Sequence, residues 1–328
     1  MTNSDGRIYV IAEAAQGYEG DPTVAKLLVR AAAGSGADAV KFQIIFAEDL
    51  AQPGYKYFDL FTSLEMSADE WVDVRSLAGD LGLDFYVDVF GAKSVEVLRQ
   101  LDANGAKLHS TSFFDEDLFA TVAELCPVTL ISIAGIYPEE VLRRAVTLNP
   151  ASTILMYGIQ AEPTPFQANN LNRIPELRAR SSLQIGFMDH TDGGSSYANV
   201  PSLLALAMGV RVFEKHITIS RCMEMEDYVS ALSPDDFRGY VDLLQKAIAI
   251  LGSSELQLTT DEVAYRERSL KRVVAGSEIA PGEALTTEKL ALIRPTTPRG
   301  FHRFDDVIGR RAARAINVGE IIDKDSIL

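Results

Sequence analysis

Cysteine is nearly absent from this sequence of 328 residues. Cys126 and Cys222 stand alone, without the spacing of a metal site or a disulfide framework, so we expect reduced thiols and a cytoplasmic protein. The first residues show no basic region followed by an apolar stretch, and no secretory signal is expected. No apolar run approaches the roughly 18 residues that a membrane-spanning helix needs.

Positive charge is also scarce. The formal net charge is −15 at pH 7 and no basic tract is present, which argues against nucleic acids and anionic membranes as partners. An anionic substrate would therefore have to be held by a few local cations. A glycine-rich G-x-G-x-x-G motif is missing after the first apolar run, which weakens the alternative of a doubly wound dinucleotide-binding sheet.

What the sequence does contain is a regular alternation of apolar runs and amphipathic segments. The runs are mostly apolar, as parallel strands covered on both faces are. Three helix starts are readable at Asp21-Pro22, Ser67–Glu70 and Ser233-Pro234. Eight such units in about 250 residues predict a (β/α)8 barrel. The expected strands are Ile8–Ala12, Ala39–Phe42, Phe85–Asp88, Lys107–Ser110, Val128–Ser132, Thr153–Tyr157, Gln184–Met188 and Val212–His216.

The pattern changes beyond residue 252. A polar stretch is followed by short β-like runs separated by turn-forming residues at 280–283 and 317–320. We therefore predict a barrel domain over residues 1–255, a linker over 256–268 and a small β-rich domain over 269–328.

Two of the four histidines, His190 and His216, come where expected strands end, with carboxylates beside them. Because the carboxyl ends of barrel strands meet at one face, two imidazoles there make a divalent metal site the first hypothesis. The alternative is that both histidines only cap their strands.

Short motifs stand out at the expected strand ends and in the C-terminal segment. The barrel motifs are Val10–Glu13, Gly36–Gln43, Asp189–Gly193 and Phe213–Thr218, and the C-terminal ones are Arg268–Leu270, Pro281–Glu283, Arg294-Pro295 and Ile308-Gly309. The barrel motifs resemble those of the sialic acid synthase family, in the order and at the approximate spacing of that family. The C-terminal motifs similarly resemble the antifreeze-like (SAF) domain that follows the barrel in these proteins.

The resemblance implies a transferase that condenses phosphoenolpyruvate with an amino-sugar aldehyde or related aldose. The products would be a 2-keto-3-deoxy sugar acid and phosphate. It also implies a divalent cation, most often Mn²⁺ with Mg²⁺ or Co²⁺ as alternatives. A homodimer is implied too, in which the small domain of one chain covers the barrel of the other.

By the same resemblance, His190 and His216 match the metal ligands, and Glu13, Glu214 and Asp227 are the candidate catalytic carboxylates. Glu13 could instead merely pair with Lys41, and a lysine could form a Schiff base as in a class I aldolase. The candidate substrate-binding residues are Lys41, Gln43, Asp88, Lys107, Ser110, Ser132, Gln160, Glu162, Asp189 and Arg294.

The sequence departs from the family pattern on the expected substrate side. Asp88 replaces a threonine, Glu162 lies in a run that has lost a histidine and a tyrosine, and His109 replaces a small residue. We expect Asp88 and Glu162 to add negative charge at the barrel mouth and to change the acceptor, with poor turnover of N-acetylmannosamine. The alternative is a catalytically silent relative that binds a sugar acid or serves as a scaffold.

Overall fold

The computed structural model describes residues 7–297 and 299–328, so the N-terminal segment considered for a signal lies outside it. The chain divides into two compact units, Met1–Gly252 and Ser253–Leu328. The division falls three residues before the boundary expected from the sequence. No helix among the described residues is long and apolar enough to cross a membrane.

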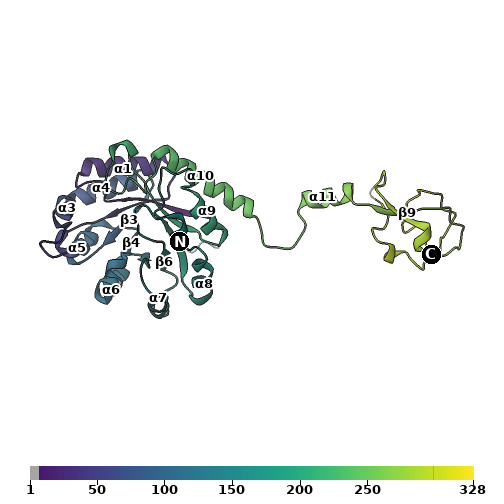
Figure 1. Cartoon of the computed structure of the whole chain (residues 1–328), viewed down its shortest axis with the longest axis horizontal. Helices are drawn as coiled ribbons and strands as arrows, with labels where there is room; N and C mark the ends of the chain where they lie inside the picture. The colour runs from purple at the N-terminus through teal and green to yellow at the C-terminus, as the bar shows by residue number, and fades with distance from the viewer. Residues whose placement is uncertain (1–6, 298) are drawn as a thin grey trace. The chain divides into compact units, whose positions relative to one another are not determined.

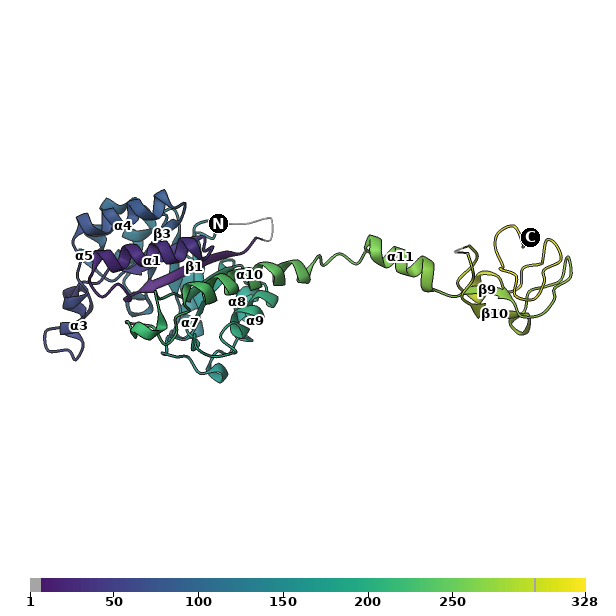
Figure 2. The same cartoon turned by 90° about the horizontal axis from the view of Figure 1, so that it is seen from above.

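The first unit is a closed barrel of parallel strands in sequential order, β1 to β8, surrounded by helices (Figures 1 and 2). The (β/α)8 prediction is therefore confirmed, and each expected strand overlaps an observed one. The strands are β1 (Tyr9–Ala15), β2 (Ala39–Gln43), β3 (Asp84–Val89), β4 (Gly105–Leu108), β5 (Thr129–Ser132), β6 (Thr153–Tyr157), β7 (Gln184–Asp189) and β8 (Val212–His216).

The helices begin where the sequence provides caps. Asp21 accepts a hydrogen bond from the Thr23 backbone N–H, Ser67 and Glu70 form a capping box, and Ser233 caps the last barrel helix. The helices of this unit are α1 (Pro22–Gly34), α2 (Ala47–Leu50), α3 (Phe58–Ser63), α4 (Ala68–Asp80), α5 (Ala92–Leu101), α6 (Glu116–Leu125), α7 (Pro138–Ala145), α8 (Arg173–Arg180), α9 (Val200–Ala207) and α10 (Pro234–Leu251).

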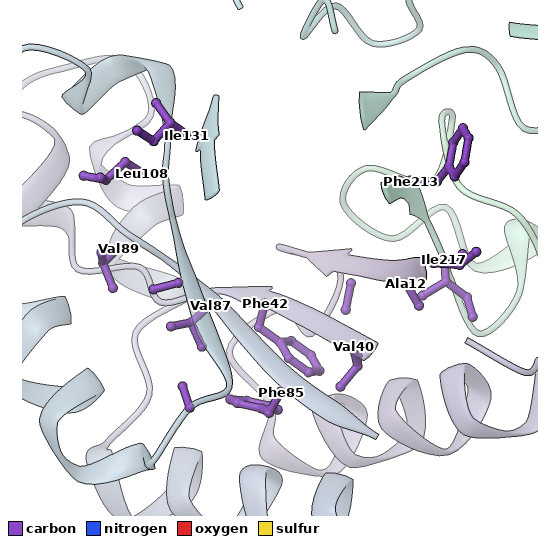
Figure 3. Packing of buried hydrophobic residues seen from close by; sticks show 14 of the residues in the cluster. Ala12, Val40, Phe42, Phe85, Val87, Val89, Leu108, Ile131, Phe213 and Ile217 are labelled. Carbon is purple, nitrogen blue, oxygen red and sulfur yellow. The ribbon is translucent and has the colours of Figure 1, made fainter. Parts of the chain in front are cut away.

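Alternate residues along each strand face opposite sides of the barrel wall. The outward residues form the main core against the helices, and Figure 3 shows Val40 and Phe42 from β2 beside Phe85 and Val87 from β3. The inward residues form a smaller apolar layer that includes Ile11, Tyr86, Ile154 and Met188. Further inward positions, toward the carboxyl ends of the strands, carry charged side chains.

The second unit is small and β-rich. Helix α11 (Thr260–Ser269) precedes an antiparallel pair, β9 (Arg272–Ala275) and β10 (Leu290–Ile293), and isolated bridges connect the remaining segments. Its separate core includes Val273, Leu285 and Ile316. The predicted β-rich character is thus present, although α11 occupies most of the expected linker.

Candidate active site

Five charged side chains lie inside the barrel near the carboxyl ends of its strands, and we call them the interior charge cluster. Each is at most 2% exposed. Three are carboxylates and two are ammonium groups, so an ionised cluster carries a formal charge of −1. The members are Glu13 of β1, Lys41 of β2, Asp88 of β3, Lys107 of β4 and Glu214 of β8.

The carboxylates surround both lysines. Lys41 Nζ contacts Glu13 and lies 2.7 Å from Asp88 Oδ1 and 3.7 Å from Glu214 Oε2. Lys107 Nζ lies 2.6 Å from Glu214 Oε1, 3.3 Å from Asp88 Oδ2 and 3.6 Å from Glu13 Oε2. The pairing of Glu13 with Lys41 is therefore real, and it forms part of a larger arrangement.

Two ammonium groups are shared among three carboxylates, and the pKa values of Glu13 and Glu214 are shifted in opposite directions. Burial raises the pKa of Glu13 to about 8; Lys41 opposes the shift and Glu214 adds to it. Burial would also raise the pKa of Glu214, but Lys107 and Lys41 hold it well below its ordinary value. The cluster thus contains one carboxyl group that can hold a proton near neutral pH and one that stays ionised.

His190 follows β7 and His216 ends β8, and their rings meet beside this cluster. The ring centroids are 4.9 Å apart with an interplanar angle of 64°, and the residues are 5% and 4% exposed. Burial lowers the pKa of both imidazoles, and for His190 the adjacent His216 lowers it further. Nδ1 of His190 and both ring nitrogens of His216 have no hydrogen-bond partner among the described residues.

Buried, neutral imidazoles with unpartnered nitrogens are suited to a divalent cation. Within residues 7–297 and 299–328, no group of three or more His, Cys, Asp or Glu side chains is arranged to hold a metal. The protein can therefore offer two nitrogen ligands here. Oxygen atoms of water or substrate would complete the coordination, as in other metal sites that keep positions open.

A second carboxyl pair lies beside His216. Burial raises the pKa of Asp227 to about 6; His216 opposes the shift, whereas a hydrogen bond with Glu162 adds to it. Asp227 Oδ2 accepts a hydrogen bond of 3.2 Å from the Gln16 backbone N–H. The Gln16 side chain in turn donates to Gln43 Oε1 at 2.9 Å. These contacts bring three predicted residues, Asp227, Glu162 and Gln43, into one network.

Uncharged polar groups lie at the ends of strands β4 to β6 or just beyond them. Ser110 Oγ donates a hydrogen bond of 3.1 Å to Gln160 Oε1. Ser132 Oγ is buried and has no partner within the described parts of the chain. Ser110, Ser132 and Gln160 were all predicted to bind substrate. The Ser132 hydroxyl can form a hydrogen bond with a ligand.

Two predicted substrate residues make contacts of a different kind. Strand alternation turns Asp189 outward, where its carboxylate accepts from Thr191, from Ser202 of α9 at 2.8 Å and from Lys215 at 3.1 Å. Asp189 thus joins the barrel wall to the helices and does not face the interior, where the predicted role in substrate binding would place it. Arg294 belongs to the second unit, where its Nε donates to the Ser269 backbone oxygen.

The predicted charge at the mouth also needs a correction. Asp88 is fully buried between the two lysines, so it neutralises cations instead of adding free negative charge at the rim. Glu162 is the exposed member of the pair and contacts Asp227. Sequence reasoning missed Gln16 and Met188, whose sulfur lies 3.7 Å from Lys107 Nζ. The polar position three residues after Glu13 was the available signal for Gln16.

The sequence matches the NeuB family over residues 28–256 and the SAF domain over residues 272–328. The chain belongs to the NeuB family. The resemblance to sialic acid synthases that the motifs indicated is therefore confirmed.

Individual relatives span nearly the whole of this NeuB-family chain. The spore coat polysaccharide biosynthesis protein SpsE of Bacillus subtilis is 30% identical, with 99% of this chain and 94% of the relative covered. A pseudaminic acid synthase of Campylobacter jejuni is 26% identical, with 98% and 96% covered. The crystal structure of an N-acetylneuraminic acid synthetase from Leptospira borgpetersenii has a TM-score of 0.74 at 22% identity, covering 82% and 96%, which shows a shared fold.

Proposed function

We propose that this chain is a metal-dependent synthase that joins phosphoenolpyruvate to an amino-sugar or related aldose, giving a 2-keto-3-deoxy sugar acid and phosphate. The observation that carries the proposal is the meeting of two buried, unpartnered imidazoles with the interior charge cluster at one end of a NeuB-family barrel. Relatives named as pseudaminic, legionaminic and N-acetylneuraminate-9-phosphate synthases support the same reaction class.

His190 and His216 would hold the cation, for which Mn²⁺ is the first choice and Mg²⁺ or Co²⁺ the alternatives. When bound, such an ion acts as a Lewis acid that stabilises negative charge developing on a carbonyl oxygen. Two imidazoles together with oxygen ligands suit Mn²⁺, although affinity alone does not separate it from other first-row metals.

The interior charge cluster provides the proton transfers. C3 of phosphoenolpyruvate forms the new bond to the aldehyde carbon, and the aldehyde oxygen takes the proton held on the Glu13 carboxyl group. Water then adds to C2 and gives one proton back to Glu13. The C2–O bond to phosphate breaks as the remaining proton of the new C2 hydroxyl passes to the departing phosphate, which leaves the ketone. Glu214, which stays ionised, stabilises the positive charge that develops at C2.

Asp227 and Glu162 are assigned to the acceptor sugar. Their carboxyl pair beside His216 favours an acceptor with an amine or several hydroxyl donors and disfavours a second anionic group. We propose an acceptor other than N-acetylmannosamine, because the sequence departs from the family pattern on the expected substrate side.

Phosphate release from phosphoenolpyruvate tests the proposal. With Mn²⁺ and a panel of amino-sugar aldehydes, release is expected with at least one acceptor and is expected to disappear in His216→Ala. His302→Ala, a histidine of the second unit, is the matched control and should retain release. A lack of release with every acceptor would contradict the proposal.

A catalytically silent sugar-acid-binding or scaffold relative is the second candidate. The observation that favours it is the engagement of both lysines by carboxylates, which leaves them fewer free donors for the two anionic groups of phosphoenolpyruvate than for the single carboxylate of a sugar acid. Under this candidate the chain would bind a sugar acid, yet no acceptor would release phosphate.

We also propose a homodimer in which the small domain of one chain presents Arg294 to the barrel of its partner. Support comes from exposed apolar residues on either side of the sequence boundary at residue 252, with Ile250 84%, Leu256 103% and Leu258 56% exposed. Mixing inactive His216→Ala and Arg294→Ala chains should restore activity at one site per heterodimer. Activity that stays absent after subunit exchange would contradict the arrangement.

A further inference from the structure

The interior charge cluster has few hydrogen-bond donors left for an anionic ligand. Three carboxylates engage the two lysines, and Asp88, the member that departs from the family pattern, lies within 2.7 Å of Lys41 and 3.3 Å of Lys107. The two ammonium groups already form ion pairs with carboxylates, so fewer of their N–H donors are free for phosphoenolpyruvate. Its phosphate and carboxylate both need several donors. Further donors must come from uncharged groups close by.

His109 occupies such a position, and the proposed mechanism does not use it. Strand β4 places Lys107 opposite Asp88 and Leu108 opposite Val89. Leu108 packs outward in the main core, so the next residue turns inward again while the backbone of His109 remains extended at φ −63° and ψ 152°. His109 therefore lies one interior layer above Lys107, about 6–7 Å further toward the mouth.

The contacts of the ring define its orientation. The ring lies 5.6 Å from the Phe90 ring, measured between centroids. Nδ1 lies 3.0 Å from Thr111 Oγ1 and accepts a hydrogen bond of 3.3 Å from the Thr111 backbone N–H. We assign the Thr111 hydroxyl as a second donor to Nδ1, which places the proton of the neutral imidazole on Nε2, and no described residue accepts a hydrogen bond from that nitrogen. Burial lowers the pKa of His109 to about 4, with Asp88 opposing and Lys107 and Lys41 adding to the shift, so the ring is neutral in the cell.

We propose that His109 is a specificity-determining residue whose Nε2–H donates a hydrogen bond to an anionic oxygen of phosphoenolpyruvate, offsetting the lysine charge that Asp88 neutralises. This inference rests on the proposed function for the identity of the ligand. A neutral donor suits the position, since it binds an anion without attracting the three carboxylates below it. Ser110 follows His109 and Ser132 Oγ lies unpartnered, so uncharged donors gather on this side of the mouth.

Direct binding of phosphoenolpyruvate, measured by calorimetry without acceptor, tests the role of His109. A hydrogen bond to a charged group predicts that His109→Ala weakens binding about ten- to a hundredfold. His109→Gln, whose amide places a donor near the position of Nε2, should stay within about threefold of wild type. Thermal melts of both variants check that the barrel is intact. Inorganic phosphate and pyruvate, titrated separately, show which anionic group His109 contacts.

The link to Asp88 has its own test. In an Asp88→Asn background the lysines regain donors, so His109→Ala should cost much less affinity than in the wild-type chain. Equal phosphoenolpyruvate affinity of wild type and His109→Ala would overturn the inference while leaving the proposed function standing. Binding that weakens in His109→Ala, without turnover of any acceptor by wild type, would support His109 and refute the synthase. Absence of phosphoenolpyruvate binding to wild type would refute both.

Discussion

Replacing Lys107 by methionine removes a buried ammonium group while keeping most of the side-chain volume. Glu214 Oε1 at 2.6 Å and Asp88 Oδ2 at 3.3 Å lose their contacts with it. Three carboxylates then share Lys41 alone, and the formal charge of the interior cluster changes from −1 to −2. Because breaking a buried ion pair leaves an uncompensated charge, we expect a loss of about 3–5 kcal/mol in the free energy of unfolding.

Urea denaturation of the full chain measures this loss. Lys26→Met is the matched control, since Lys26 pairs with Asp73 at 3.1 Å on the surface and should cost less than about 1 kcal/mol. Adding Glu214→Gln to Lys107→Met removes one excess negative charge and should recover most of the stability without recovering phosphate release. A Lys107→Met chain as stable as Lys26→Met would refute the description of the cluster as a coupled set of buried charges.

Three further predictions follow from the site. Burial raises the pKa of Glu13 from 4.5 to about 8, so its contribution to stability is full below pH 4.5 and is lost as pH rises through 8; Glu13→Gln should flatten urea stability across that window. Asp189→Ala should destabilise the barrel by about 3–5 kcal/mol, measured by the same denaturation, and leave the KM for phosphoenolpyruvate unchanged. With N-acetylmannosamine as the acceptor, phosphate release from phosphoenolpyruvate should be much slower than with the best acceptor in the panel. Comparable rates of release would contradict a changed acceptor.

The barrel could be predicted because its strands are short apolar runs separated by capped helices. Asp21, Ser67 and Ser233 marked helix starts that the structure contains, and the eight strand positions followed from the same alternation. The meeting of the His190 and His216 rings could be predicted as well, since parallel strands bring their carboxyl ends to one face and both residues come at such ends.

The direction of individual side chains could not be predicted in the same way. A strand buried on both faces has no alternation of polar and apolar residues, so its sequence does not tell which positions face inward. Asp189 and Lys215 pair with each other in register and turn outward, whereas His190 and His216, each one residue later in the chain, turn inward. The position of Asp88 between two lysines could not be predicted either, because it results from contacts with the side chains of two other strands.

The most direct test of the proposed chemistry is the binding of Mn²⁺ itself, followed by electron paramagnetic resonance in the absence of substrate. Wild type should bind one Mn²⁺ per chain, and His190→Ala and His216→Ala should each lose that binding while His302→Ala retains it. Unchanged Mn²⁺ binding in a chain lacking both His190 and His216 would contradict a metal centre formed by these two imidazoles.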